Sequence, residues 1–228
     1  MFNLWFGIGF VLVNFLLFLL CYRFFGKVGL YAWIGFATVL ANIQVVKVVD
    51  LFGFAMTLGN TMYATTYLCS DLLNEKYGQE QAKKAVWFGF FTLIATTIIM
   101  QMALNFVPHP DAVEQQGALA LIFGLMPRLA IASLTSYVIS QFLDVRIYTF
   151  LKKVCPKRNQ LWIRNNGSTL ISQLVDTVIF CSIAFLGFLP MDMWFDILIT
   201  TYLIKFVVSA ASTPILYIAR NFTFTKES

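Results

Sequence analysis

Long apolar runs separated by short polar connections dominate the pattern of this chain. Each run is near the ~20 residues that an α-helix needs to cross the ~30 Å hydrocarbon core of a bilayer. The runs lack the period-two alternation of membrane strands and are about twice as long as such strands. We therefore predict an all-α polytopic membrane bundle. Its spans cover residues 4–24, 28–49, 54–73, 85–106, 118–142, 168–188 and 194–219.

The first run begins close to the N-terminus, as a signal peptide would. However, no basic segment precedes it and no small-residue cleavage site follows it. We therefore interpret this run as a helix that is retained in the protein.

Composition supports a membrane protein, because 59% of the 228 residues are hydrophobic and only 12% are charged, whereas about 25% are charged in an ordinary soluble domain. This excludes a cytosolic enzyme, a secreted disulfide scaffold and a nucleic-acid-binding module. The four cysteines, at positions 21, 69, 155 and 181, form no CxxC pair. We therefore expect no disulfide framework, no metal site and no cofactor.

The basic residues are distributed unevenly among the connections. Most of the 16 Lys and Arg residues follow the first, third, fifth and seventh runs, whereas the connections 105–116 and 189–193 contain none. Because basic connections stay on the cytoplasmic side, we predict an N-terminus outside and a C-terminus inside. Lys47, Arg128 and Lys205 lie in or at the ends of the runs instead.

Polar residues recur at helical spacing in the sixth run. Ser168, Ser172 and Asp176 are four residues apart, and Gln173 and Phe180 flank the same face. By helical rise from Ser168, Asp176 lies near the membrane midplane. This stripe is a candidate binding surface.

The seventh run places Lys205 at a similar depth to Asp176, so we predict that the two side chains meet. An ionisable group inside a span costs several kcal/mol and indicates a functional site by default. The alternative is a structural ion pair that only joins two helices.

The fifth run contains Pro127, which marks either a kink or a helix start. Arg128 is then either deep in the bundle or at its outer mouth. A second polar stripe follows at spacings of four, four and three: Ser133, Tyr137, Gln141 and Asp144. The small residues of this run equally suit close helix packing.

Two carboxylates stand at the end of the third run. Asp71 and Glu75 are four residues apart and share a face. Like charges at this spacing repel, and both oppose the helix dipole. The pair therefore needs a proton or a cation from another helix, unless it is a solvated helix end. In the second run, Asn42 can bond a ligand or a neighbouring helix.

Three motifs in order carry a family resemblance: SDLLNEKYG at 70–78, RLAIAS at 128–133 with Gln141 and Asp144, and NGST at 166–169 with Gln173 and Asp176. They resemble the queuosine precursor transporter family of vitamin-uptake-like membrane proteins. The resemblance implies a six-helix core at 28–220, preceded by an added helix at 1–27 and followed by a tail at 221–228. It implies import of 7-cyano-7-deazaguanine, 7-aminomethyl-7-deazaguanine or both across a bacterial inner membrane.

The candidate substrate-binding residues combine the polar stripes with these motifs: Asn42, Asp71, Glu75, Arg128, Ser133, Tyr137, Gln141, Asp144, Gln173, Asp176, Phe180 and Lys205. A guanine-like edge presents an N–H and an NH₂ that one carboxylate can accept together. We assign this role to Asp176 and Glu75. Phe180 and Tyr137 are the candidates for stacking on the flat heterocycle.

Energy coupling stays open at this point. No GxxxxGK[ST] phosphate loop is present, so ATP would have to be used by a partner subunit. Otherwise Asp71, Glu75 or Asp144 carries a proton. The rival functions are an intramembrane enzyme with paired carboxylates, such as Asp71 with Asp144, and a structural assembly protein. The expected partners are a 7-deazapurine and the lipid bilayer, with no direct nucleic-acid contact, and a homo-oligomer is left open.

Overall fold

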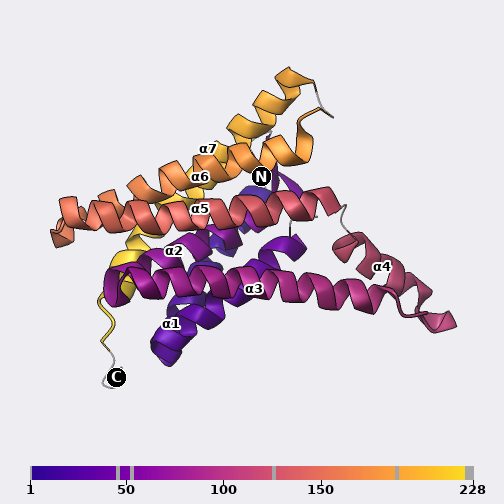
Figure 1. The fold of residues 1–228 in the computed structure, drawn as a ribbon, viewed down its shortest axis with the longest axis horizontal. Coiled ribbons are helices and arrows are strands. Elements are labelled where there is room, and N and C mark those ends of the chain that lie inside the picture. Colours follow the sequence, from indigo (N-terminus) through magenta and orange to yellow (C-terminus); the bar gives the residue numbers. More distant parts are fainter. Residues whose placement is uncertain (1, 45–46, 52–53, 125–126, 188–189, 224–228) are drawn as a thin grey trace.

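The computed structural model describes residues 2–44, 47–51, 54–124, 127–187 and 190–223, and helices dominate it (Figure 1). The predicted all-α membrane bundle is confirmed. The elements are α1 (Phe2–Gln44), β1 (Val48–Leu51), β2 (Phe54–Thr57), α2 (Gly59–Tyr77), α3 (Gln79–Leu104), the 3-10 turn η1 (Pro110–Ala112), α4 (Val113–Phe123), α5 (Pro127–Val154), the 3-10 turn η2 (Arg158–Gln160), α6 (Leu161–Phe185) and α7 (Met191–Arg220).

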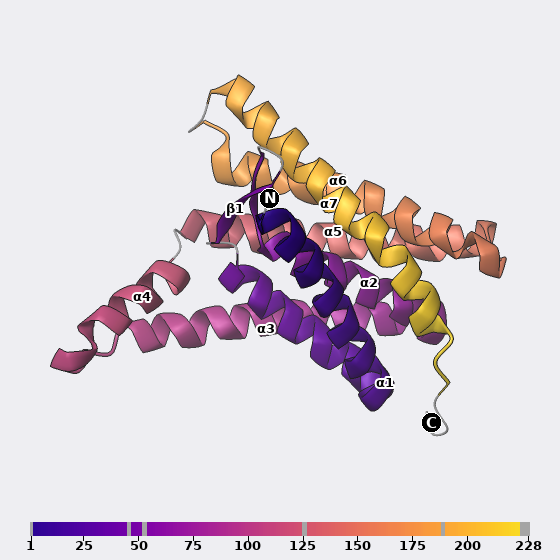
Figure 2. The same ribbon diagram turned by 180° about the vertical axis from the view of Figure 1, so that it is seen from behind.

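Helix α1 consists of two arms that fold back on each other (Figure 2). The break is at Gly26, whose φ of 54° and ψ of −139° are open to glycine and costly for other residues. The rings of Phe18 and Trp33 pack edge to face across the arms, with centroids 5.7 Å apart. The prediction of two separate runs before residue 50 is therefore confirmed.

A short antiparallel hairpin lies between α1 and α2. Val48 pairs with Thr57 and Leu51 pairs with Phe54. The predicted helical runs 28–49 and 54–73 are thus wrong where they meet, because α1 ends at Gln44 and α2 begins at Gly59. Hydropathy does not separate strand from helix in short apolar segments, and β-branched and aromatic residues suit a strand.

The predicted run 118–142 is divided between two helices, α4 and α5. Pro127 is the first residue of α5, so it marks a helix start and not a kink. Proline suits this position because its missing N–H would be unpaired there in any case. At about 16 Å, α4 is too short to cross the bilayer, and it packs beside the end of α3, where Gln116 Nε2 donates to Leu104 O at 2.8 Å.

The segment between the predicted runs 118–142 and 168–188 is mostly helical, because α5 continues to Val154 and α6 already begins at Leu161. The predicted run 168–188 therefore begins seven residues late, and its last residue lies outside the described part of the chain. Residues 224–228 of the predicted tail also lie outside it.

Within the described residues, four helical segments are long and apolar enough to cross a membrane: Trp5–Gln44, Gln79–Leu104, Arg158–Ala184 and Ile197–Arg220. Helices α2 and α5 are more polar, and many of their polar side chains are buried. Helix α2 packs against α1, α3, α5 and α7. Helix α2 therefore lies inside the bundle, whereas α5 packs mainly against α2, α3 and α6.

The basic connections meet at one end of the bundle, on the left in Figure 1, where α2, α5 and α7 end and α6 begins. The turn of α1 joins them there, because the hydroxyls of Tyr22 and Tyr77 lie 3.2 Å apart. Lys76 Nζ also donates to Phe222 O at 2.6 Å. We call this the basic end.

Candidate functional site

The polar stripe of α6 lies inside the bundle. Ser168, Ser172 and Asp176 are all buried, as predicted, and Arg164 extends the stripe by one turn towards the basic end. Since α6 begins at Leu161, Asp176 lies about 22 Å from that helix start by rise. The stripe is thus longer than the sequence indicated, and it reaches from the basic end to the middle of the bundle.

Asp176 and Lys205 form the predicted ion pair, with 2.6 Å between Oδ2 and Nζ. Both side chains are about one-tenth exposed. The other carboxylate oxygen of Asp176 accepts from Ser140 Oγ at 3.1 Å, and Tyr67 OH donates to Ser140 Oγ at 2.9 Å. We call Asp176, Lys205, Ser140 and Tyr67 the central cluster. It joins α2, α5, α6 and α7 at mid-depth.

Helix α2 contributes a polar face that the sequence analysis missed. Tyr63, Tyr67, Ser70 and Asn74 follow at spacings of four, three and four, which is a helical stripe. The phenol groups of Tyr63 and Tyr67 both lie within electrostatic reach of Asp176. The signal was present in the sequence, but only the carboxylates at the end of this run were considered.

Two predicted site residues meet at Tyr63. Its hydroxyl lies near the side chains of Ser133 and Asn42. The amide of Asn42 also donates to Thr38 O at 2.9 Å within its own helix. Asn42 and Ser133 are therefore connected to the central cluster through the aromatic face of α2.

The two predicted glutamines are both buried but differ in their bonding. Gln141 Nε2 donates to Thr66 Oγ1 at 3.0 Å, and Gln141 Oε1 accepts from Ser70 Oγ at 3.4 Å. In contrast, Gln173 Oε1 has no hydrogen-bond donor among the described residues. Gln173 therefore presents an unused acceptor one turn from Asp176.

Two predicted site residues, Tyr137 and Arg128, are not among the four residues of the central cluster. The hydroxyl of Tyr137 lies against α3, where a Cβ added to Gly89 would be 2.2 Å from it. Tyr137 is 1% exposed, so it serves helix packing. Arg128 is the second residue of α5, and its side chain lies outside the described part of the structure. Phe180 is half-buried, one turn beyond Asp176.

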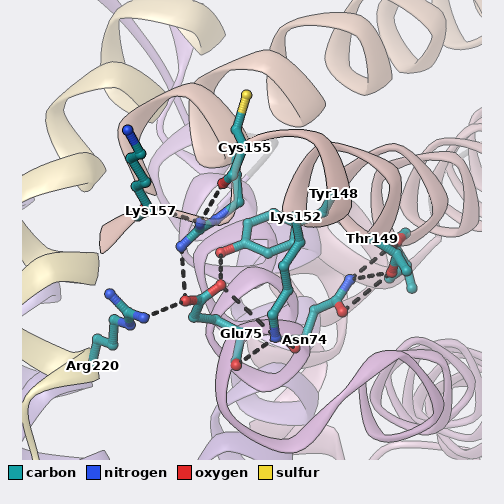
Figure 3. Close-up of polar contacts among 10 residues, drawn as sticks. Asn74, Glu75, Tyr148, Thr149, Lys152, Cys155, Lys157 and Arg220 are labelled. Atoms are coloured by element: carbon teal, nitrogen blue, oxygen red, sulfur yellow. Dashed lines mark hydrogen bonds and ion pairs between the residues drawn. The ribbon is translucent and has the colours of Figure 1, made fainter. Parts of the chain in front are cut away.

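Glu75 is surrounded by cations at the basic end (Figure 3). Its Oε1 lies 2.8 Å from Arg164 Nη2 and 2.9 Å from Arg220 Nη2. Its Oε2 accepts from Tyr148 OH at 3.2 Å and lies 3.9 Å from Lys152 Nζ. We call these five residues the Glu75 cluster. The prediction of an interhelical cation is confirmed, and the alternative of a solvated helix end is wrong for Glu75.

The Glu75 cluster also closes the last turn of α2. Lys152 Nζ donates to Asn74 O at 2.8 Å and to Glu75 O at 2.6 Å, which satisfies carbonyls that the helix end leaves unpaired. Burial lowers the pKa of Lys152, although the nearby Glu75 carboxylate opposes this. Arg164 Nη1 donates to Cys155 O at 2.7 Å. Four helices are thus tied together at the basic end.

Asp71 and Asp144 lie between the central cluster and the Glu75 cluster. Ser172 Oγ donates to Asp144 Oδ1 at 2.8 Å, and the buried carboxyl of Asp71 lies within electrostatic reach of that of Asp144. The site thus contains three buried polar centres: an ion pair, a carboxyl pair and a cation cluster. Such a polar interior suits a small polar ligand inside a membrane protein.

Comparisons with known proteins identify the family of this chain. The family model described as a putative vitamin uptake transporter matches residues 57–219. A Bacillus subtilis (strain 168) protein named probable queuosine precursor transporter is 52% identical over 221 residues, covering 97% of this chain and 96% of the relative. The Escherichia coli (strain K12) queuosine precursor transporter is 25% identical over 173 residues, 74% of each chain. No solved structure matches. The chain therefore belongs to the queuosine precursor transporter family.

Proposed function

We propose that this protein imports 7-cyano-7-deazaguanine, 7-aminomethyl-7-deazaguanine or both across a bacterial inner membrane, and that the central cluster recognises them. The names of the relatives support the substrate class. The observation that carries the assignment of the site is the buried pair of Asp176 and Lys205 at mid-depth. The excess of basic residues at the basic end supports its placement in the cytoplasm, with the N-terminus outside.

The chemistry of the central cluster fits a guanine-like edge. Such an edge has adjacent N–H and NH₂ donors beside a carbonyl oxygen. The carboxylate of Asp176 can accept from both donors, and the ammonium of Lys205 can donate to the carbonyl. The substrate then replaces the bonds that Lys205 and Ser140 make to Asp176 in this structure. The unused oxygen of Gln173 offers one further acceptor.

Aromatic rings beside Asp176 can hold the flat heterocycle. Stacking of a base on an aromatic side chain contributes about 1–3 kcal/mol. Half-buried Tyr63 lies within electrostatic reach of Asp176, and half-buried Phe180 is one turn further along α6. We assign stacking to these two rings, because Tyr137 is packed against Gly89 of α3.

Transport requires access to the site from each side in turn. The Glu75 cluster joins α2, α5, α6 and α7, so it holds the basic end together in this conformation. Its ion pairs have to separate before a substrate can leave past them. Glu75 is therefore assigned to gating, and Asp176 alone keeps the role of carboxylate acceptor.

Equilibrium binding of labelled 7-cyano-7-deazaguanine to the purified protein in detergent tests the substrate and the site together. Asp176→Asn removes a charged acceptor, and hydrogen bonds to charged groups contribute about 1.5–3 kcal/mol. We expect binding to weaken by about 10- to 150-fold. Asp192→Asn is the matched control, because Asp192 is exposed in the first turn of α7. Equal affinity of Asp176→Asn and the control would refute the proposed site.

A charge exchange separates recognition from a purely structural ion pair. The double variant Asp176→Lys/Lys205→Asp restores opposite charges across α6 and α7. If the pair only joined the helices, this variant would recover both thermal stability and uptake. Recognition of a guanine-like edge requires each charge at its own position, so we expect stability to recover and uptake to stay lost. Co-purification of ATPase subunits would instead favour an ATP-driven importer.

A further inference from the structure

Asp71 of α2 and Asp144 of α5 are 1% and 0% exposed, respectively. The two carboxyls lie within electrostatic reach of each other. Among the described residues, no N–H or O–H group donates to either oxygen of Asp71 or to Oδ2 of Asp144. Ser172 Oγ donates only to the other oxygen of Asp144, Oδ1, at 2.8 Å. Three buried carboxyl oxygens thus lack a hydrogen-bond donor among the described residues.

An ionised carboxylate only accepts hydrogen bonds, so one carboxyl of the pair can donate to the other only when it carries a proton. Two ionised carboxylates in contact would also repel strongly in a buried site. The basic residues around them contact other carboxylates. Arg164 and Arg220 contact Glu75, and Lys205 contacts Asp176. A proton is therefore the cation that fits this pair.

The charges around the pair strengthen this requirement. Glu75 is one turn from Asp71 on α2 and adds a further negative charge. The phenols of Tyr148 and Tyr67 lie near Asp71 and Asp144, respectively, and neither supplies a cation.

The titratable groups on α1 and α3, which also pack against α2, lie further from the carboxyl pair. Tyr22 and Tyr31 of α1 contact Tyr77 and Gln81, beyond Glu75, and Lys27 lies over the Tyr77 ring. On α3, Glu80 pairs with Lys83 near the helix start.

The pair connects the substrate site with the gate. Asp144 bonds Ser172, which is one turn from Asp176 in the central cluster. Asp71 is one turn from Glu75 in the Glu75 cluster. We propose that the Asp71–Asp144 pair binds one proton that moves with each substrate molecule, so that a pH gradient drives accumulation. This rests on the proposed import function. The proton is released when the Glu75 cluster separates and water reaches the pair.

Uptake by the full chain in sealed liposomes tests the proposal. With the outside more acidic by about one pH unit and one proton for each neutral substrate, labelled 7-cyano-7-deazaguanine should accumulate about tenfold. Asp71→Asn keeps the size of the side chain and its ability to donate to Asp144, but it cannot release a proton. We expect it to lose gradient-driven accumulation, which Asp192→Asn should retain. Asp144→Asn is the second variant, and Asp192→Asn is the control.

The outcomes separate the two proposals. If the parent protein binds no substrate, the proposed function fails. If it binds and exchanges substrate but a pH gradient changes nothing, or if Asp71→Asn still accumulates it, only the proton proposal fails. Infrared spectra of the purified protein check the proton without any substrate. A protonated carboxyl carbonyl band that both Asn variants remove is expected, and a parent protein without such a band would overturn the proposal.

Discussion

Glu75→Gln tests whether the Glu75 cluster is a closed structural contact. The side chain of Glu75 is 3% exposed and that of Arg164 is 1% exposed, so their 2.8 Å contact is shielded from water. Removal of one partner of a buried ion pair costs about 3–5 kcal/mol, because the other charge stays buried without compensation. We expect a loss of this size in the free energy of unfolding.

Arg220→Met should have a smaller effect than Glu75→Gln. The Arg220 side chain is 26% exposed and lies 2.9 Å from Glu75 Oε1. Removal of one hydrogen bond to a charged group costs about 1.5–3 kcal/mol, and partial exposure places this variant towards the low end. The loss of stability should be larger for Glu75→Gln than for Arg220→Met, because the Glu75 side chain is more deeply buried.

Denaturant titration of the purified variants in one detergent measures both losses, and Glu80→Gln is the matched control. Glu80 pairs with Lys83 at 2.8 Å, but its side chain is 75% exposed, so its removal should leave the unfolding transition unchanged. If Glu75→Gln unfolded together with the control, Glu75 would not hold the basic end together. Glu75 would then return to the candidates for substrate binding.

Two further predictions concern packing and orientation. Gly89→Ala should destabilise the protein by about 1–3 kcal/mol, because the new Cβ would be 2.2 Å from the Tyr137 hydroxyl. Adding Tyr137→Phe should recover much of this loss, as measured by thermal unfolding. If Gly89→Ala alone left the unfolding transition unchanged, the Tyr137 side chain would be shown to move aside. A cysteine at His109 should react with a membrane-impermeant thiol reagent in intact cells, whereas Cys155 at the basic end should react only after permeabilisation; the reverse pattern would invert the proposed orientation.

Hydropathy predicted the helical class because the runs are long and the bilayer demands about 20 residues. Hydropathy did not identify the hairpin, because the mostly apolar segments 48–51 and 54–57 are compatible with either a helix or a strand. It also placed the start of α6 seven residues late. This error had a consequence for the site, because Arg164 was counted in a connection when it is one turn before Ser168 on the same buried stripe.

Depth and charge were sufficient to predict the contact between Asp176 and Lys205. An unpaired charge inside a membrane is costly, so opposite charges at equal depth tend to pair. Spacing along one helix did not reveal which neighbour each face meets. Tyr137 shares the α5 stripe with Gln141, yet its hydroxyl packs against Gly89 because a glycine there leaves room. Such contacts depend on how the helices are arranged, which periodicity alone leaves open.

The buried stripe of α6 gives the three centres a common support. Arg164, Ser172 and Asp176 contact Glu75 of α2, Asp144 of α5 and Lys205 of α7, respectively. Four residues of helix rise about 6 Å, so these contacts lie along one rigid edge from the basic end to mid-depth. A rotation of α6 against α2 and α5 changes the gate and the hydrogen bond to the carboxyl pair in one movement. In the proposed mechanism, substrate binding at Asp176 would weaken the ion pair with Lys205 that ties α6 to α7 in this orientation. Occupation of the site and opening of the basic end would then be coupled through α6 alone.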